Sequence, residues 1–273
     1  MNGVEASNSF WLIGSGNMAG AMLHGWLDAG MDPARFLVVR PSGRAVAPGV
    51  QVVTALPEQA PPPELVMLGI KPQKLDEVAP WLAPRLGPGT ILISILAGVE
   101  QASLRERFPG VRAVVKAMPN TPVALRKGVV ELFSDNADGE VRSRIHALMA
   151  ALGHAAWFDD ERLFHAAGHL TGAGPAFLFR YIDALAAAGE GLGLPPGQAA
   201  QLALAMAEGA GALAARSGES MATLVQRVAS PGGTTQAGLA VLDEGLNDLV
   251  RRTLEASRRR SGEMAQEARR VPR

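Results

Sequence analysis

The hydrophobic pattern of the first 160 residues alternates between short apolar runs and stretches with helical spacing. The apolar runs predict buried strands at residues 10–13, 36–39, 65–70, 90–96, 111–116 and 128–133. Helical spacing occupies the intervals at residues 18–27, 75–86 and 101–108. Continuously apolar strands that alternate with helices are typical of a parallel sheet covered on both faces. The N-terminal part is therefore predicted to be an α/β domain.

The pattern changes near residue 160, because only helical spacing of apolar residues continues beyond it. The predicted helices span residues 175–192, 195–217, 223–229, 236–244 and 247–266. We therefore expect two domains, one α/β over residues 1–160 and one all-α over residues 161–273. The helical part is rich in Ala and Gly and poor in large side chains. We expect it either to complete its core across a partner chain or to form an ordinary monomeric bundle.

The composition narrows the kinds of function. Of the 273 residues, 48% are hydrophobic and 19% are charged, and the formal net charge is zero. No overall positive field therefore favours nucleic acid or an anionic membrane. The chain has no cysteine, which excludes disulfides, thiolate metal sites and cysteine nucleophiles. The polar residues 1–8 do not resemble a signal peptide, and the most apolar stretch, residues 199–215, contains Gln201 and Glu208. We expect a cytoplasmic protein with neither nucleic-acid nor membrane partners.

A glycine motif follows the first predicted strand. Residues 14–19 (GSGNMA) fit the pattern G-x-G-x-x-[GA] at the head of a predicted helix. In a dinucleotide site Gly14 would permit the tight turn, Gly16 would let a pyrophosphate approach the backbone, and Ala19 would allow close packing of helix on strand. The helix N-terminus offers free N–H groups to the phosphates. This context favours a dinucleotide site over a simple glycine-rich connection.

The end of the second predicted strand distinguishes between cofactors. NAD sites usually carry an acidic residue there to bond the ribose 2′-hydroxyl, whereas this strand ends in Arg40, Pro41, Ser42, Gly43 and Arg44. Arg40 and Ser42 favour NADP(H), and Arg44 either assists them or is an ordinary exposed arginine.

Two further strand ends are predicted to border the cofactor. One carries Gly69, Lys71 and Pro72, and the other carries Ala97. Small residues at this edge let a ribose and a nicotinamide lie against backbone. Lys71 either donates to a ribose hydroxyl or stays solvated.

Two segments have the composition of ligand loops. Residues 117–122 (AMPNTP) combine two prolines with the polar side chains of Asn120 and Thr121. Residues 230–235 (SPGGTT) precede a predicted helix, so their hydroxyls and exposed N–H groups suit a small carboxylate. The alternative for the second segment is an N-capped interhelical turn.

The histidines do not indicate catalysis or metal binding. His165 and His169 are four residues apart and could share one helix face and a metal ion. The chain shows no HExxH pattern and no evident third ligand, so packing or surface roles are the better interpretation. We predict no metal site.

Six segments together resemble the pyrroline-5-carboxylate reductase family over nearly the whole chain. They are residues 13–19 (IGSGNMA), 70–73 (IKPQ), 94–98 (SILAG), 117–122 (AMPNTP), 172–177 (GAGPAF) and, most specific of all, 230–235 (SPGGTT). The resemblance implies a Rossmann-type N-terminal domain and an all-α C-terminal domain for dimerisation and substrate binding. It implies homodimers that assemble further into decamers. The implied reaction is reduction of 1-pyrroline-5-carboxylate to L-proline with NADPH or NADH, the last step of proline biosynthesis.

The resemblance also implies roles for single residues. Ser230, Gly233, Thr234 and Thr235 would contact the substrate carboxylate, and Thr235 would also lie near the ring nitrogen as the catalytic hydroxyl. Glu161 falls where the family often has an acid near the substrate. The cofactor site expected from the motif and the resemblance together comprises Gly14, Ser15, Gly16, Asn17, Met18, Arg40, Ser42, Gly69, Lys71, Pro72, Ala97 and Asn120.

Three short segments depart from the usual pattern of the family. The residues concerned are His165, Gly168, Thr171, Ala173, Gln226 and Arg227. Because they fall on the expected substrate side and dimer contact, two alternatives stay open. One is a reductase of a related cyclic imino acid, such as one with a six-membered ring. The other is a catalytically weak NADP-binding regulatory protein.

Overall fold

The computed structural model describes residues 9–270, with side chains described up to residue 263. The chain forms two compact units, Met1–Gly172 with Ser261–Arg273 and Ala173–Arg260. Helix α5 (Glu161–Thr171) begins at the predicted domain boundary and belongs to the first unit. The compact units and the predicted domains therefore differ by this helix with Gly172 and by the end of the chain from Ser261, and the division at residue 160 stays a prediction.

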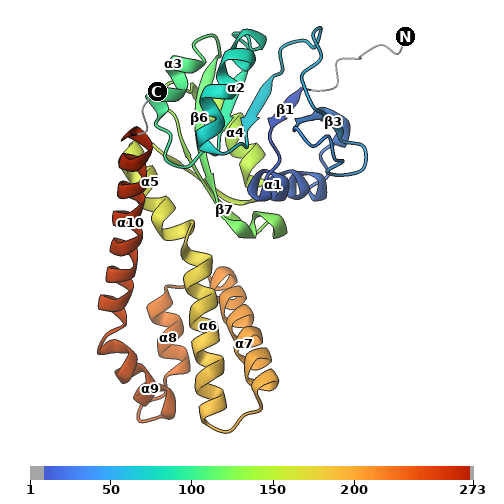
Figure 1. The fold of residues 1–273 in the computed structure, drawn as a ribbon. Helices are drawn as coiled ribbons and strands as arrows, with labels where there is room; N and C mark the ends of the chain where they lie inside the picture. Colours follow the sequence, from blue (N-terminus) through green and yellow to red (C-terminus); the bar gives the residue numbers. More distant parts are fainter. Residues whose placement is uncertain (1–8, 271–273) are drawn as a thin grey trace. The chain divides into compact units, whose positions relative to one another are not determined.

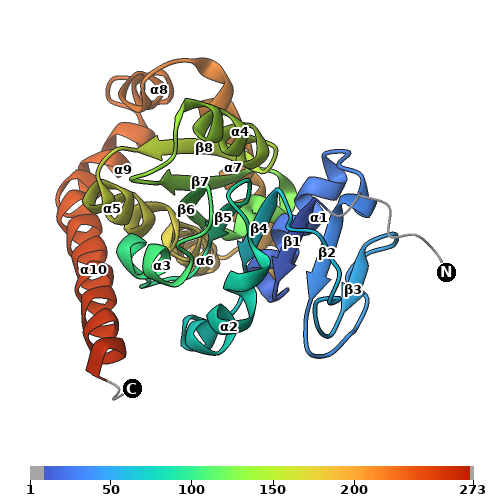
Figure 2. The same cartoon turned by 90° about the horizontal axis from the view of Figure 1, so that it is seen from above.

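The first unit is built on one sheet of eight strands, which lie side by side in the order β3-β2-β1-β4-β5-β6-β7-β8 (Figure 2). The strands are β1 (Phe10–Ile13), β2 (Phe36–Val39), β3 (Gln51–Val53), β4 (Leu65–Leu68), β5 (Ile91–Ser94), β6 (Ala113–Pro119), β7 (Gly128–Phe133) and β8 (Gly153–Phe158). The strands from β3 to β6 are parallel to their neighbours. Strand β7 runs antiparallel to β6, and β8 is parallel to β7. The predicted parallel sheet is thus confirmed for β1, β2, β4, β5 and β6, but β7 reverses direction.

Helices cover both faces of this sheet (Figures 1 and 2). They are α1 (Asn17–Asp28), α2 (Leu75–Leu82), α3 (Gln101–Arg107), α4 (Gly139–Ala150) and α5. Alternate residues of β1 point to opposite faces: Phe10 belongs to one buried cluster with side chains of α1 and α4, and Trp11 belongs to another with side chains of α2 and α3. Each large side chain buried in these two layers contributes about 1.5–3 kcal/mol. The predicted Rossmann-type fold with a sheet covered on both faces is confirmed.

Short 3-10 turns shorten one predicted helix and connect several of the elements. The helix predicted over residues 75–86 ends at Leu82 and continues as a 3-10 turn at Ala83–Arg85. The other 3-10 turns are Pro33–Arg35, Pro72–Lys74 and Thr121–Leu125. The last of these connects β6 to β7, and so short a connection suits antiparallel neighbours, because a parallel pair needs a crossover of a dozen residues or more.

The second unit is helical, as predicted. Its helices are α6 (Gly174–Gly191), α7 (Pro196–Ser217), α8 (Met221–Val228), α9 (Thr234–Asp243) and most of α10 (Leu246–Arg270) (Figure 1). Helices α6 and α7 pack against each other. Among the described residues of this unit, the buried hydrophobic side chains are those of Ala186, Ala199 and Ala203. Larger apolar side chains stay exposed, including Phe179 at 64% and Leu192 at 89%. One chain alone therefore provides little core here.

Within residues 9–270, no helix is long and apolar enough to cross a membrane.

Candidate functional site

The turn after β1 is fixed by close packing of three small residues. Gly14 has a φ of +86°, and its N–H donates to Val39 O at 2.8 Å. A Cβ on Gly14 would lie 2.8 Å from Gly69 O, and a Cβ on Gly69 would lie 2.6 Å from the Cβ of Ala19. Side chains at Gly14 and Gly69 would therefore collide with neighbouring atoms of the turn or of α1. Both glycines are required by the fold itself.

Gly16 differs because the fold does not require it. It is the N-cap of α1 with a φ of −76°, which any residue can adopt. A Cβ built there would meet no atom closer than Gly69 O at 4.0 Å. Space is therefore open beside the first free amides of α1, where the positive end of the helix dipole favours an anion. Ser15, Asn17 and Met18 flank this position and are partly or fully exposed.

The end of β2 presents two cations. Arg40 is half-buried and its N–H donates to Val53 O at 2.9 Å, which fixes the backbone beside the sheet. Gly43, at a φ of +60°, closes a turn by donating to Arg40 O. Ser42 and Arg44 are exposed on this turn. In the part of the chain that the structure describes, no ion pair involves Arg40 or Arg44, so their charge is not neutralised by a carboxylate.

The ends of β4 and β5 complete a continuous edge. Gly69 and Lys71 follow β4, and Lys71 is exposed just before the 3-10 turn that Pro72 opens. Ala97 is exposed after β5, and next to it Gly98 has a φ of +74° with open space around it. Because β2, β1, β4 and β5 are parallel neighbours, all these residues lie at the carboxyl edge of the sheet, where open α/β sheets bind ligands.

Asn120 lies at the same edge, after β6, but its side chain is engaged inside the protein. Its Nδ2 donates to Thr171 O at 3.1 Å, and its Oδ1 accepts from Val129 N at 2.8 Å. The residue is buried. The side chain thus joins β7 and α5 to the segment after β6, and a contact between Asn120 and the cofactor stays a prediction.

Glu161 takes part in a polar cluster that the sequence did not indicate. Lys116 of β6 is only 4% exposed, and its Nζ lies 2.6 Å from Glu161 Oε1 and 3.4 Å from His165 Nε2. Burial lowers the pKa of the Lys116 ammonium, and the Glu161 carboxylate opposes this shift. Burial and the Lys116 charge lower the pKa of His165. The one available signal was a lysine within an otherwise apolar strand.

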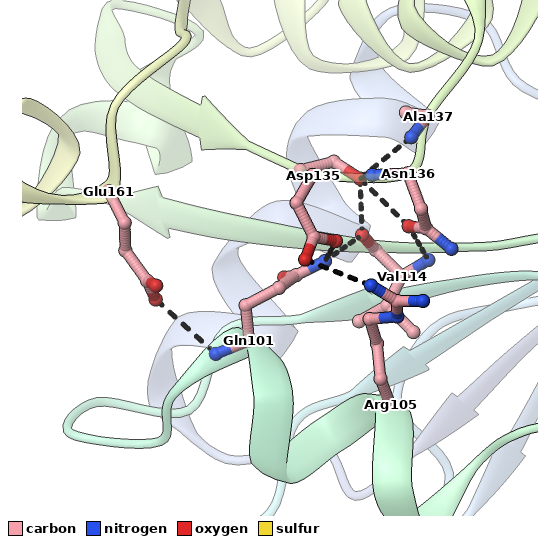
Figure 3. Close-up of polar contacts among 8 residues, drawn as sticks. Gln101, Arg105, Val114, Asp135, Asn136, Ala137 and Glu161 are labelled. Atoms are coloured by element: carbon pink, nitrogen blue, oxygen red, sulfur yellow. Dashed lines mark hydrogen bonds and ion pairs between the residues drawn. The ribbon is translucent and has the colours of Figure 1, made fainter.

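Gln101, at the start of α3, supports the same carboxylate. Its backbone N–H donates to Glu161 Oε1 at 3.3 Å, while its Nε2 donates to Val114 O at 2.8 Å and to Asp135 Oδ1 at 3.1 Å. Figure 3 shows Gln101 between these partners, with Arg105 paired to Asp135. The same oxygen of Glu161 therefore accepts hydrogen bonds from both Lys116 and Gln101. A role for Glu161 in binding substrate stays a prediction.

Residues 230–235 comprise the end of the turn between α8 and α9 and the first two residues of α9. Gly232 has a φ of +72°, and a Cβ on Gly233 would lie 2.5 Å from Ser230 Oγ. Gly233 is the N-cap of α9 and has no side chain that could bond the first amides of the helix. Thr234 and Thr235 are exposed in the first turn of α9. Free amides and two hydroxyls therefore surround one helix N-terminus, an arrangement that suits a carboxylate.

The residues that depart from the family pattern have distinct surroundings. A Cβ on Gly168 would lie 1.9 Å from Met118 Sδ, so the glycine permits α5 to approach β6 closely. The hydroxyl of Thr171, at the end of α5, contacts Glu131 Oε1. Arg227 of α8 pairs with Glu219 at 2.5 Å. Ala173 is the N-cap of α6, and Gln226 is exposed on α8.

Comparison with known proteins gives a consistent result for both units. Residues 161–264 match the family model described as pyrroline-5-carboxylate reductase dimerisation, and residues 9–98 match the model described as NADP oxidoreductase, coenzyme F420-dependent. The pyrroline-5-carboxylate reductase of Pseudomonas aeruginosa is 36% identical over 93% of this chain and 96% of its own length. That of Pisum sativum is 32% identical over 95% and 97%.

Solved structures agree with these relatives. The pyrroline-5-carboxylate reductase of Coxiella burnetii superposes with a TM-score of 0.86 at 30% identity, over 94% of this chain and 98% of the other. The Plasmodium falciparum enzyme, solved with NADP bound, has the same fold, with a TM-score of 0.80 at 24% identity over 96% and 100%.

Proposed function

This chain belongs to the pyrroline-5-carboxylate reductase family, and from that premise we propose that it reduces 1-pyrroline-5-carboxylate to L-proline with NADPH. This reaction is the last step of proline biosynthesis. The structural observation that carries the proposal is Gly16, whose open surroundings leave room for a phosphate at the N-terminus of α1. A glycine that the packing does not need, at a position where a ligand must approach the backbone, supports a dinucleotide site.

The residues at the carboxyl edge of the sheet fit NADPH. The amides around Gly16 would bind the diphosphate, and Arg40 with Ser42 would bind the 2′-phosphate. A guanidinium binds a phosphate dianion far better than a ribose hydroxyl, so NADPH is preferred and NADH is the weaker alternative. The ribose and nicotinamide would be bordered by Gly69, Lys71, Pro72, Ala97 and Asn120. NADPH, when bound, supplies the hydride.

The turn at residues 230–235 would hold the substrate. Ser230, Gly233 and Thr234 would bind the carboxylate through hydroxyl and amide groups at the N-terminus of α9. Thr235 would orient the ring nitrogen and relay a proton. A cyclic imine can enter in its protonated form, so a hydroxyl suffices and no strong general acid is needed. Glu161 is proposed to act near the substrate as well.

The protein is further proposed to be a homodimer that assembles into decamers. The match of residues 161–264 to a dimerisation domain supports the dimer. Large apolar side chains exposed on α6 and α7, among them Phe179 and Leu204, give it a physical basis, because a second chain would bury them. We also propose a cytoplasmic location, because NADPH for biosynthesis is available there.

The decisive experiment follows NADPH oxidation by the purified protein. We expect turnover with 1-pyrroline-5-carboxylate, slower turnover with the six-membered homologue, and a higher KM for NADH than for NADPH. Faster turnover of the six-membered ring would reassign the substrate. Binding of NADPH without turnover of either imine would favour a regulatory protein. Reactions without imine serve as the control for unspecific oxidation.

A further inference from the structure

Glu131 is a carboxyl group inside the apolar layer between the sheet and α5. It lies in the middle of β7, opposite Met118 of β6 and Ala156 of β8, and it is 1% exposed. Phe133, two residues along the same strand, packs against Phe164 of α5 with ring centroids 6.1 Å apart. An ionised carboxylate in such surroundings is costly unless it is paired and fully hydrogen-bonded.

Glu131 does not have such partners. Thr171 Oγ1 contacts its Oε1, and its Oε2 has no hydrogen-bond partner among the described residues. No ion pair of residues 9–263 includes it. The titratable or charged side chains on the elements packed against it are Lys116 on β6, His154 on β8, and Glu161, Arg162, His165 and His169 on α5. Arg162 is exposed and paired with Asp160.

These neighbours do not supply a counter-ion. Lys116 is paired with Glu161, and His165 lies in contact with the same pair. Burial has the largest effect on the pKa of Glu131 and raises it, although hydrogen bonds from Thr171 and from its own backbone N–H, and then a positive charge on His154, act in the opposite direction. The surroundings of Glu131 therefore favour the protonated acid.

A count of protons leads to the same conclusion. Thr171 Oγ1 lies within hydrogen-bonding distance of two acceptors, Glu131 Oε1 and, at 3.2 Å, Ala167 O. A hydroxyl has one proton and can donate only once. Both contacts are full two-centre hydrogen bonds only if Glu131 carries a proton and donates it to Thr171 Oγ1, while Thr171 donates to Ala167 O.

We propose that Glu131 is a neutral carboxylic acid in the folded protein and acts as a positioning residue for the end of α5 and the segment at residues 117–122. Thr171, which it holds by the side chain, accepts through its backbone O from Asn120 Nδ2 at 3.1 Å. Asn120 in turn is fixed to β7 by two bonds with Val129, at 2.8 and 3.2 Å. That this segment borders the nicotinamide rests on the proposed function; the protonation state of Glu131 does not.

The protonation state can be read without any activity. With ¹³C-labelled glutamate, infrared difference spectra of wild type minus Glu131→Gln should show the C=O band of a protonated acid at neutral pH. The band should weaken as the pH rises through the folded-state pKa of Glu131. A difference spectrum with carboxylate bands alone at neutral pH would overturn the proposal. Should Glu131→Gln fail to fold, Thr171→Val serves instead, because loss of its hydroxyl must shift the frequency of the same acid band, and an unshifted spectrum overturns the assignment.

Thermal unfolding tests the same point by linkage. Burial raises the pKa of Glu131, so this side chain ionises less readily in the folded than in the unfolded state. The protonated Glu131 therefore makes its full contribution to stability at low pH, and this contribution is lost as the pH rises through the folded-state pKa. Glu131→Gln cannot ionise there. The Tm of wild type relative to this variant should therefore fall with rising pH, and a constant difference would contradict the neutral acid.

Kinetics tests the positioning role. Gln can still donate to Thr171, so Glu131→Gln should keep wild-type kcat and KM for NADPH at neutral pH. Glu131→Val cannot donate, and loss of that hydrogen bond should weaken NADPH binding by about 2- to 10-fold. NADPH affinity is measured by titration without imine, so a wrong substrate assignment leaves this readout intact. Equal NADPH affinity in folded Val and Gln variants would refute the positioning role.

Discussion

The substitution Gly16→Ala separates the ligand site from the fold. The φ of −76° is allowed for alanine, and the new Cβ would lie 4.0 Å from its nearest neighbour, an ordinary contact. Alanine gains about 0.4–1 kcal/mol of stability by restricting the unfolded chain. It loses about 0.5–1 kcal/mol as a poorer N-cap than glycine. These effects cancel, so the free energy of unfolding should stay within about 0.5 kcal/mol of wild type.

Binding of NADPH should respond very differently. The methyl group would occupy the space through which a diphosphate reaches the first amides of α1, and a hydrogen bond to a charged group contributes about 1.5–3 kcal/mol. Loss of one such bond raises the Kd by at least about tenfold, since 1.4 kcal/mol corresponds to a factor of ten. Fluorescence titration with NADPH measures the Kd, and chemical denaturation measures the stability of the same sample.

Gly69→Ala is the matched control. Its Cβ would lie 2.6 Å from the Cβ of Ala19, so it overpacks the contact between β4 and α1. Overpacking costs about 1–3 kcal/mol. We therefore expect Gly69→Ala to lose stability, whereas Gly16→Ala should keep it. A Gly16→Ala protein that is stable and binds NADPH with wild-type affinity would refute the assignment of this turn to the diphosphate.

Four further substitutions test the rest of the site. Thr235→Ala should lower kcat by about 100-fold, as for loss of a proton-relaying group, and leave the Kd for NADPH within about twofold of wild type. Arg40→Ala should raise the KM for NADPH by about tenfold or more and leave that for NADH unchanged, because the guanidinium addresses the 2′-phosphate. Glu161→Ala should destabilise the fold by about 2–4 kcal/mol in thermal unfolding, since it leaves Lys116 buried without its partner. Lys116→Met should cost less than about 1 kcal/mol, because the remaining Glu161 is 30% exposed and can be hydrated.

Each of these has a contrary outcome. A parallel loss of turnover and NADPH affinity in Thr235→Ala would mean that the turn after α8 is structural. An equal rise of both KM values in Arg40→Ala would show that the arginine supports the loop and not the phosphate. If Lys116→Met lowers the free energy of unfolding as much as Glu161→Ala does, the deeper burial of Lys116 does not decide which partner is more costly to leave unpaired.

The elements that the sequence predicted best are those buried on both sides. Residues 10–13 and 36–39 are apolar at every position, and their predicted bounds agree with β1 and β2. Steric contact with the residue after β4 imposes Gly14, whereas Gly16 is recognisable only from its place in the motif, because the packing leaves space around it. The fold class and the helical second half could be predicted from such patterns, because the spacing of apolar residues reflects which side chains are buried.

Other features of the structure have no local pattern in the sequence. The direction of β7 is set by the short connection after β6, and apolar content does not distinguish parallel from antiparallel pairing. Helix α4 and strand β8 were not predicted, because β8 is half-exposed and α4 is polar over much of its surface. The partners of Lys116 and Glu131 lie 45 and 40 residues away along the chain, so no local pattern indicates them.

The contact between Gly69 and Ala19 has a consequence for how this sequence can change over generations. Their β-carbons cannot both be present at 2.6 Å, so at most one of the two positions can carry a side chain. An alanine can arise at position 69 without penalty from this contact only after position 19 has become glycine. The reverse order passes through a chain with two colliding methyl groups. The residues that evolution allows at position 69 therefore depend on the residue at position 19. A substitution tolerated in one relative can be harmful in another.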